Sequence, residues 1–139
     1  MNHSDQESLD NITKKFFGAF ISQDLGNVNL SALKDLFIPN AVIIKTCVTK
    51  PVIYSFQEFI DPRQKILTDG TLIKFKESEV DSNTVISGNI AHRHLVYKKS
   101  GVHEGKSFDE KGVKSIQFVR MPSGWKISAL AWDDQRDGS

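Results

Sequence analysis

Apolar residues recur at helical spacing through the first part of the chain. Over residues 5–22 they form one face of a long amphipathic helix, made by Leu9, Ile12, Phe16, Ala19 and Phe20. Ser4 and Glu7 match the S-x-x-E capping box, which starts helices because it satisfies amide donors of the first turn. The pattern therefore predicts a helix over 5–22 that ends near Gly26.

Three shorter elements follow this helix. Asn29 can cap a short second helix, which Pro39 ends because proline disfavours helical geometry at the residue before it. The β-branched run over 41–48 predicts a strand. A second capping box starts a third helix over 55–67, and an Asp-Pro step in its middle kinks or divides it.

The rest of the chain alternates between apolar and polar residues, which predicts strands. The expected strands are 71–81, 83–99, 105–121 and 125–134. Residues typical of turns separate them at 81–83, 100–105 and 121–124. Because consecutive strands are joined by short turns, we expect an antiparallel sheet.

The hairpin over 112–134 organises this sheet. In its second strand, Trp125, Ile127, Ala129 and Ala131 alternate with Lys126, Ser128, Leu130 and Trp132. Both faces of this strand are largely apolar, so we expect both to be covered. One face then belongs to a pocket or core and the other to a partner.

Composition and charge narrow the class of protein. A chain of 139 residues with 39% hydrophobic and 25% charged residues is typical of one soluble globular domain, here 1–139 with a core over about 5–134. A net charge of +1 gives no field that would attract nucleic acid or a membrane surface. Cys47 is the single cysteine, so no intramolecular disulfide forms. With no secretory signal or membrane span in the sequence, we expect a cytoplasmic location.

The order of elements resembles the nuclear transport factor 2-like superfamily, which includes the SnoaL-like and ketosteroid isomerase-like families. The matching stretches are 36–42, 112–120 and 124–127. The resemblance implies an α+β fold, in which a cone-shaped, curved antiparallel sheet packs helices on its concave face, as in a cystatin-like α+β barrel. It also implies a pocket for a small apolar molecule, and a homodimer through the outer sheet face.

Two histidines are the first candidates for catalysis. His92 and His94 flank Arg93 on a predicted strand, so both imidazoles point to one face and Arg93 to the other. Such a pair can act as general acid and base, with the phenol of Tyr54 or Tyr97 as an electrophilic partner. Scytalone dehydratase, which has the fold implied above, uses histidines and tyrosines without a metal. The alternative is a pair of hydrogen-bonded histidines on a strand surface.

Four other residues are candidates for ligand binding: Cys47, Tyr97, Gln117 and Trp132. Each has a structural alternative, since a cysteine or an aromatic residue on a strand also serves as packing. In particular, Trp132 can stack on a ligand ring or fill a dimer interface.

Known activities of the superfamily match this chain incompletely. Ketosteroid isomerases place a carboxylate base on the first strand, where this chain has no acidic residue and carries Lys45 instead. Limonene epoxide hydrolases use an arginine and two aspartates, of which Arg93 and Asp133 supply only a part. No nucleotide fingerprint or zinc motif is present, so we expect neither a cofactor nor a metal.

Two hypotheses remain open at this point. The first is a cone that binds a small apolar molecule, with cofactor-independent lyase, isomerase or hydrolase chemistry if it is an enzyme. The second is a non-catalytic dimeric interaction module, in which Val119, Leu130 and Trp132 are buried between subunits and side chains fill the interior.

Overall fold

The computed structural model describes residues 2–21, 28–47 and 49–135. Three helices are present in these ranges: α1 (Asn2–Ala19), the 3-10 helix η1 (Leu30–Leu36) and α2 (Phe56–Thr68). The strands are β1 (Phe37–Lys45), β2 (Val52–Tyr54), β3 (Leu72–Ser87), β4 (Ile90–His103), β5 (Lys106–Met121) and β6 (Gly124–Gln135). No helix of the described ranges is long and apolar enough to cross a membrane.

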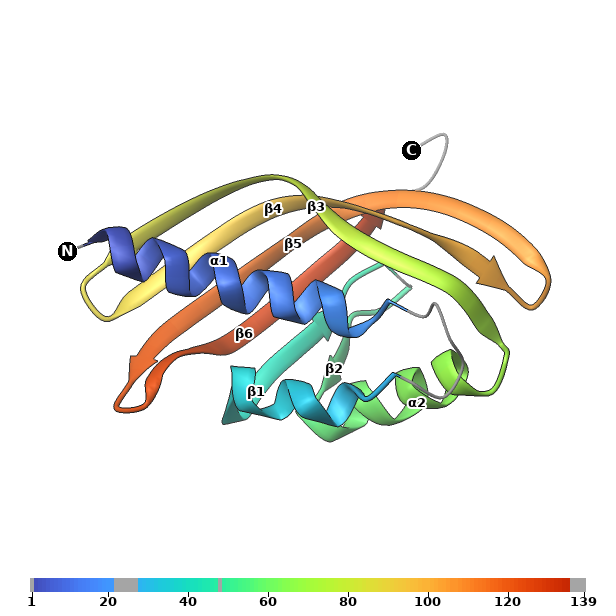
Figure 1. Cartoon of the computed structure of the whole chain (residues 1–139), viewed down its shortest axis with the longest axis horizontal. Helices are drawn as coiled ribbons and strands as arrows, with labels where there is room; N and C mark the ends of the chain where they lie inside the picture. Colours follow the sequence, from blue (N-terminus) through green and yellow to red (C-terminus); the bar gives the residue numbers. More distant parts are fainter. Residues whose placement is uncertain (1, 22–27, 48, 136–139) are drawn as a thin grey trace.

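The six strands form one open, curved sheet in the order β2-β1-β6-β5-β4-β3. All neighbours are antiparallel except β1 and β6, which are parallel and make the sheet mixed. Helix α1 packs against β3 and β6, and α2 packs against β1 and β3, so the helices share the concave side (Figure 1). This arrangement confirms the α+β fold that the resemblance implies.

The helix boundaries follow local capping only in part. At the start of α2, the Ser55 hydroxyl accepts from the amide of Glu58 at 3.2 Å, and the Glu58 carboxylate accepts from the amide of Ser55 at 2.8 Å. This confirms the second capping box. The first was wrong, because α1 begins at Asn2 and Ser4 lies inside its first turn. The predicted end near Gly26 lies outside the described residues.

The boundary between β3 and β4 differs from the prediction. Strand β3 continues past Asp81 as far as Ser87, and the chain turns at Gly88-Asn89. Gly88 has φ +60, a conformation that glycine adopts without steric cost. The polar stretch near Asp81 is a β-bulge, since the pairing with β4 shifts by one residue between Glu79 and Asp81. A bulge and a turn use the same polar residue types, which explains the error.

A second bulge corrects the prediction about β6. Gln117 pairs with Ala129 and Phe118 pairs with Ile127, so Ser128 is left without a partner in register. The extra residue inverts the alternation, and as a result four large side chains are buried on one face: Trp125, Ile127, Leu130 and Trp132. The other face of β6 carries alanines and charged residues, namely Ala129, Ala131, Lys126 and Asp133. The prediction of two apolar faces was therefore wrong, because the large apolar side chains of β6 all lie on one face.

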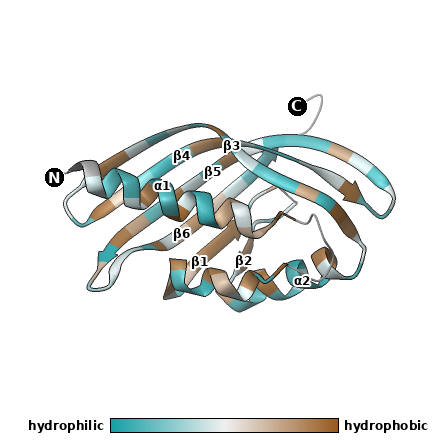
Figure 2. Cartoon of the chain, viewed as in Figure 1, coloured by the Kyte–Doolittle hydropathy of each residue, from teal (hydrophilic) through white to brown (hydrophobic). Residues whose placement is uncertain are grey.

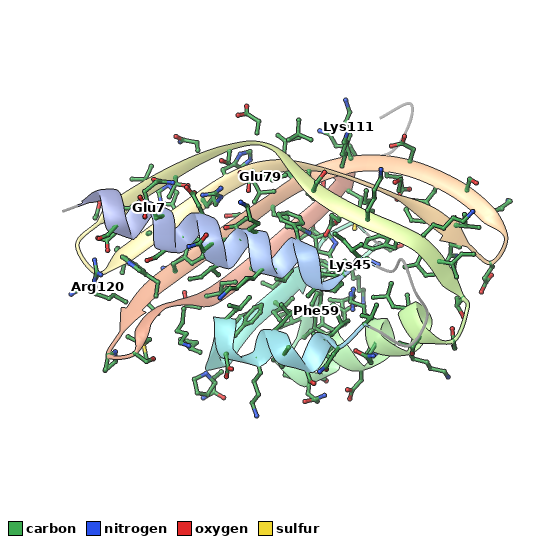
Figure 3. The ribbon with its side chains drawn as sticks, in the orientation of Figure 1. Glu7, Lys45, Phe59, Glu79, Lys111 and Arg120 are labelled. Carbon is green, nitrogen blue, oxygen red and sulfur yellow. The ribbon has the colours of Figure 1, made fainter. Side chains whose placement is uncertain are left out.

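Aromatic side chains fill much of the space between the helices and the sheet. Figure 2 shows hydrophilic residues along the outward side of α1 and apolar residues on β1 behind it. Phe16 of α1 lies 5.2 Å from Phe20 and 6.2 Å from Phe37, measured between ring centroids. In Figure 3, Phe59 and Lys45 lie between the helices, whereas Lys111 points away from them.

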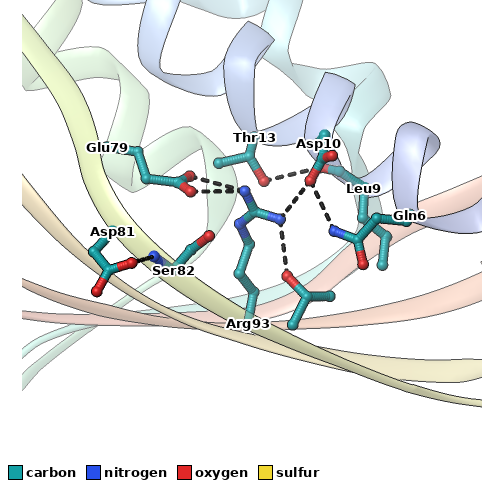
Figure 4. Close-up of polar contacts among 9 residues, drawn as sticks. Gln6, Leu9, Asp10, Thr13, Glu79, Asp81, Ser82 and Arg93 are labelled. Carbon is teal, nitrogen blue, oxygen red and sulfur yellow. Dashed lines mark hydrogen bonds and ion pairs between the residues drawn. The ribbon is translucent and has the colours of Figure 1, made fainter.

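Arginines of the sheet hold α1 in place by ion pairs. The buried Arg93 side chain donates to Asp10 of α1 at 2.8 Å and to both carboxylate oxygens of Glu79 at 2.7 and 3.0 Å (Figure 4). Nearer the start of α1, Arg120 donates to both oxygens of Asp5. This hydrogen bonding lowers the pKa of Asp5 to about 2. Arg93 thus has a structural role in joining α1 to the sheet.

Gly112 of β5 leaves room for the phenol of Tyr97. These two residues face each other across β4 and β5, and a Cβ atom on Gly112 would lie 2.5 Å from the Tyr97 oxygen and 2.4 Å from the carbonyl oxygen of Asp133. Because Gly112 has no side chain, the Tyr97 ring can cross β5 and reach Asp134 on β6. A glycine is thus needed to connect three strands through one side chain.

We expect Gly112→Ala to destabilise the protein by about 1–3 kcal/mol, because the added methyl group overlaps Tyr97 and the backbone of β6. Urea denaturation measures the change. Ser115→Ala, at an exposed position of the same strand, is the matched control and should stay within about 0.5 kcal/mol. Equal losses for the two variants would contradict the steric explanation.

Candidate functional site

A cavity of about 170 Å³ lies between the helices and the concave face of the sheet. Apolar side chains make most of its wall, namely Phe16, Phe20, Phe59, Ile66, Leu67, Leu72, Phe75, Leu130 and Trp132. An apolar protein cavity of about 150 Å³ is large enough to hold benzene. The space in this chain therefore matches a molecule with about one ring.

Charged side chains interrupt the apolar wall on the sheet side and near α2. They are Lys45, Arg63, Glu77, Lys99, Lys114 and Asp134. Strand register explains part of this set, because Lys114 of β5 lies opposite Trp132 of β6, which lies opposite Lys45 of β1. Side chains in one row across a sheet share a face. The cavity thus combines aromatic surface with a polar wall.

Lys114 is the most deeply buried cation of this wall, with 5% of its surface exposed. Its Nζ lies 4.2 Å from the ring centroid of Tyr97, 5.3 Å from that of Trp132 and 3.7 Å from Oε2 of Glu77. Burial lowers the pKa of Lys114, and the nearby Glu77 carboxylate opposes that shift. The amine therefore loses its proton more readily than a solvated lysine.

Asp134 is the centre of a second polar group. Its carboxylate accepts hydrogen bonds from the Tyr97 phenol, from Nζ of Lys99 at 2.9 Å and from the Cys47 thiol at 3.4 Å. Burial alone would raise the pKa of Asp134, but the hydrogen bonds from Tyr97 and Lys99 outweigh it and lower that pKa. Burial and the same bond to Asp134 raise the pKa of Tyr97. Asp134 is therefore ionised and Tyr97 neutral near pH 7.

Arg63 of α2 projects from the helix over aromatic rings. Its guanidinium carbon lies 4.2 Å from the ring centroid of Phe59 and 5.4 Å from that of Trp132. Burial lowers the pKa of Arg63, while the Tyr54 phenol beside it acts in the opposite direction. The side chain thus presents a partly desolvated positive charge at the wall of the cavity.

Three of the predicted site residues lie outside this cavity. His92, His94 and Gln117 are exposed on the outer face of the sheet, and His92 pairs with Gln117 across β4 and β5. The predicted alternation is confirmed, since both histidines point outward and Arg93 points inward. Neither His92 nor His94 is therefore available to a ligand inside the cavity.

The other four predicted residues gather at or near the cavity. Trp132 lines it, and the Tyr54 ring stacks on Trp132 with 6.4 Å between centroids. Tyr97 and Cys47 both donate to Asp134, which also lines the cavity. The prediction that Trp132 fills a dimer interface gains no support, because within one chain this residue is already buried.

Sequence reasoning missed the charged residues of the wall. Lys99 follows Lys98 and Asp134 follows Asp133, and such adjacent like charges are typical of solvated surfaces. The side chains of Lys99 and Asp134 are nevertheless only 19% and 14% exposed. A signal was present on β4, because Lys99 lies two residues after Tyr97 and therefore shares its inward face. The same signal was present on β6, because Asp134 lies two residues after Trp132 and beyond the bulge at Ser128.

Metal binding has no support from the geometry. Among the side chains that the structure describes, no three of His, Cys, Asp or Glu gather closely enough to hold a metal ion.

Comparison with known proteins gives a clear result for structure alone. No family model and no curated protein matches the sequence. A solved protein from Kribbella flavida superposes with a TM-score of 0.78 at 10% identity, over 98% of this chain and 94% of that one. A nuclear transport factor 2-like protein with a cystatin-like fold from Novosphingobium aromaticivorans superposes with a TM-score of 0.72 at 14% identity, over 98% of this chain and 84% of that one. The chain has the nuclear transport factor 2-like fold.

A third solved structure with this fold carries a provisional activity in its name. It is a provisionally assigned dehydratase of the nuclear transport factor 2-like family from Streptomyces avermitilis, with a TM-score of 0.73 at 14% identity, over 97% of this chain and 99% of that one. At such identities the likeness concerns the fold, and the activity of this chain has to be argued from its cavity.

Proposed function

We propose that this chain binds a small, mostly apolar molecule of about one ring in its cavity. The observation that carries the proposal is the cavity itself, in which aromatic walls face a row of charged side chains. A concave apolar site with a few converging polar groups is the usual form of a small-molecule site. The Streptomyces avermitilis dehydratase assignment is compatible with such a role for the fold.

Binding of one-ring compounds tests this proposal directly. We expect toluene and phenol to bind with Kd values on the order of 10 μM to 1 mM, the range for ligands with seven heavy atoms. Titration of ¹⁵N-labelled protein should move amide signals near Phe59 and Trp132. The double variant His92→Ala/His94→Ala should bind within about twofold of the wild type, since both histidines lie on the outer face. Shifts confined to the outer face would refute the proposal.

We further propose that any catalysis in this cavity is cofactor-independent proton transfer of the lyase, isomerase or hydrolase type. Lys114 is the candidate base, because its amine lies at the cavity wall, is buried and has a lowered pKa. The Glu77 carboxylate, 3.7 Å from the Lys114 amine, is the group that accepts the proton from Lys114 or gives it back to Lys114. This assignment replaces the histidine pair, which does not reach the cavity.

Deuterium exchange detects such proton transfer without knowledge of the natural substrate. We expect the protein to accelerate exchange of the α-hydrogens of cyclohexanone in D₂O, measured by NMR. The rate should rise with pH through the pKa of Lys114, since the neutral amine is the base. Lys114→Met should lower the rate about 100-fold or more, and His92→Ala/His94→Ala should leave it unchanged. Equal rates for wild type and folded Lys114→Met would remove the lysine from the reaction.

Association through the outer sheet face is a second candidate function. Val85 is 42% and Ile90 is 54% exposed on that face, next to His92. Such apolar residues on a sheet face can be covered by a second copy of the chain.

Light scattering coupled to size exclusion tests this dimer. We expect a mass of twice 15.6 kDa for the wild type and of one chain for Ile90→Glu, because the charge cannot be buried unpaired. Ile53→Glu, which changes an apolar residue that is 69% exposed on the edge strand β2, is the matched control and should leave the dimer intact. A monomeric wild type would exclude this mode of association.

A further inference from the structure

The environment of Arg63 is unusual for a charged side chain. Its guanidinium carbon lies 4.2 Å from the ring centroid of Phe59, 5.2 Å from that of Tyr54 and 5.4 Å from that of Trp132. These rings attract the cation, but they also remove water from it. Loss of hydration costs free energy unless an anion or enough hydrogen-bond acceptors replace the water.

Arg63 also differs from the other two arginines in the described part of the chain. Arg93 pairs with two carboxylates, and Arg120 binds both oxygens of one carboxylate. Arg63 donates from Nη1 to the carbonyl oxygen of Phe59 in its own helix, at 3.0 Å. No described carboxylate lies within ion-pair distance of it. The guanidinium has five N–H donors, so several remain for a ligand.

The charges around the cavity do not balance. Lys99 pairs with Asp134, and Lys114 lies beside Glu77. The remaining cations of the wall are Arg63 and Lys45, for which the described residues supply no acidic partner. The cavity is therefore positive, and it favours an anionic ligand over a neutral or cationic one.

We propose that the cavity selects one-ring molecules that carry a carboxylate, and that Arg63 binds this carboxylate while the aromatic walls hold the ring. This proposal rests on the proposed function, which places a one-ring molecule in the cavity. A guanidinium matches a carboxylate through two parallel N–H···O bonds, and Lys45 adds positive potential at the same wall. Arg63 is thus a binding residue that determines specificity.

Three compounds of nearly equal shape and different charge test the proposal. Benzoate is an anion, benzamide is neutral and benzylamine is a cation at pH 7. We expect calorimetric titration to give benzoate an affinity about tenfold or more above that of benzamide, because hydrogen bonds to charged groups are the stronger ones. Benzylamine should bind more weakly than benzamide. Equal affinities for benzoate and benzamide would overturn the carboxylate proposal and leave the proposed function standing.

Variants of Arg63 separate its role from that of the cavity as a whole. Arg63→Met keeps an unbranched apolar stem and should lower benzoate affinity about tenfold or more, while benzamide affinity stays within about threefold. Arg120→Met removes an arginine that does not line the cavity and should change neither affinity. A loss of both ligands in folded Arg63→Met would show that Arg63 shapes the cavity and does not select the charge.

A second variant covers the case in which Arg63→Met does not fold. Arg63→Lys keeps the charge and loses the planar pair of donors, so its benzoate affinity should fall about threefold to tenfold. Unchanged affinity for benzoate in this variant would contradict two-point recognition by Arg63. Failure of both benzoate and benzamide to bind the wild type would overturn this proposal together with the proposed function.

Discussion

A charge on the concave face of this sheet needs a partner, because α1 and α2 keep water away from it. Removing a charged group from water is costly unless ion pairs or hydrogen bonds replace the lost hydration. Three inner cations on the strands obey this constraint, whereas Lys45 has no acidic partner among the described residues. Arg93 pairs with Asp10 of α1. Lys99 pairs with Asp134, and Lys114 pairs with Glu77. These pairs, together with the bond from Arg93 to Glu79, link four strands and one helix beside the cavity.

The pairs leave the apolar part of the cavity open. The Tyr97 ring lies across Gly112 and directs its phenol to Asp134, so a large side chain occupies the sheet surface without filling the space above it. Lys114 likewise lies against the rings of Tyr97 and Trp132 and extends toward Glu77. Aromatic faces that contact cations at the wall still offer their other surfaces to a ligand. The polar wall and the apolar space therefore depend on the same side chains.

Strand alternation explains which parts of this structure could be predicted from the sequence. On β4 no bulge occurs between His92 and Tyr97, and the predicted faces of His92, Arg93 and His94 were confirmed. On β6 the extra residue Ser128 inverts the pattern, so the face of Trp132 could not be derived by counting. The order of helices and the capping of α2 depend on residues that are close together in the sequence. Both could therefore be predicted from the sequence.

The candidate site was harder to predict than the fold. Alternation tells which residues share a face, but it does not tell which face the helices cover. His92 and His94 carry recognisable chemistry and lie on the outer face. Lys114 and Glu77 look like surface residues, yet Lys114 is buried and only 9% of the Glu77 side chain is exposed. Their environment is created by α1 and α2, which are distant in sequence from β5 and near only one end of β3. Residue type alone therefore favoured the wrong face.

The charge at the first strand of this chain is opposite in sign to the one that ketosteroid isomerases use at that place. Those enzymes need a carboxylate base there, and this chain has Lys45, with Arg63 and Lys114 at the same cavity. A base of negative charge works on a neutral substrate, whereas a cationic wall stabilises negative charge that is present or develops on the bound molecule. The same fold thus supports opposite electrostatics, because the inward positions of its strands are free to differ once each buried charge is compensated. In this chain Lys99 and Lys114 each have a carboxylate partner, whereas Arg63 and Lys45 have none among the described residues.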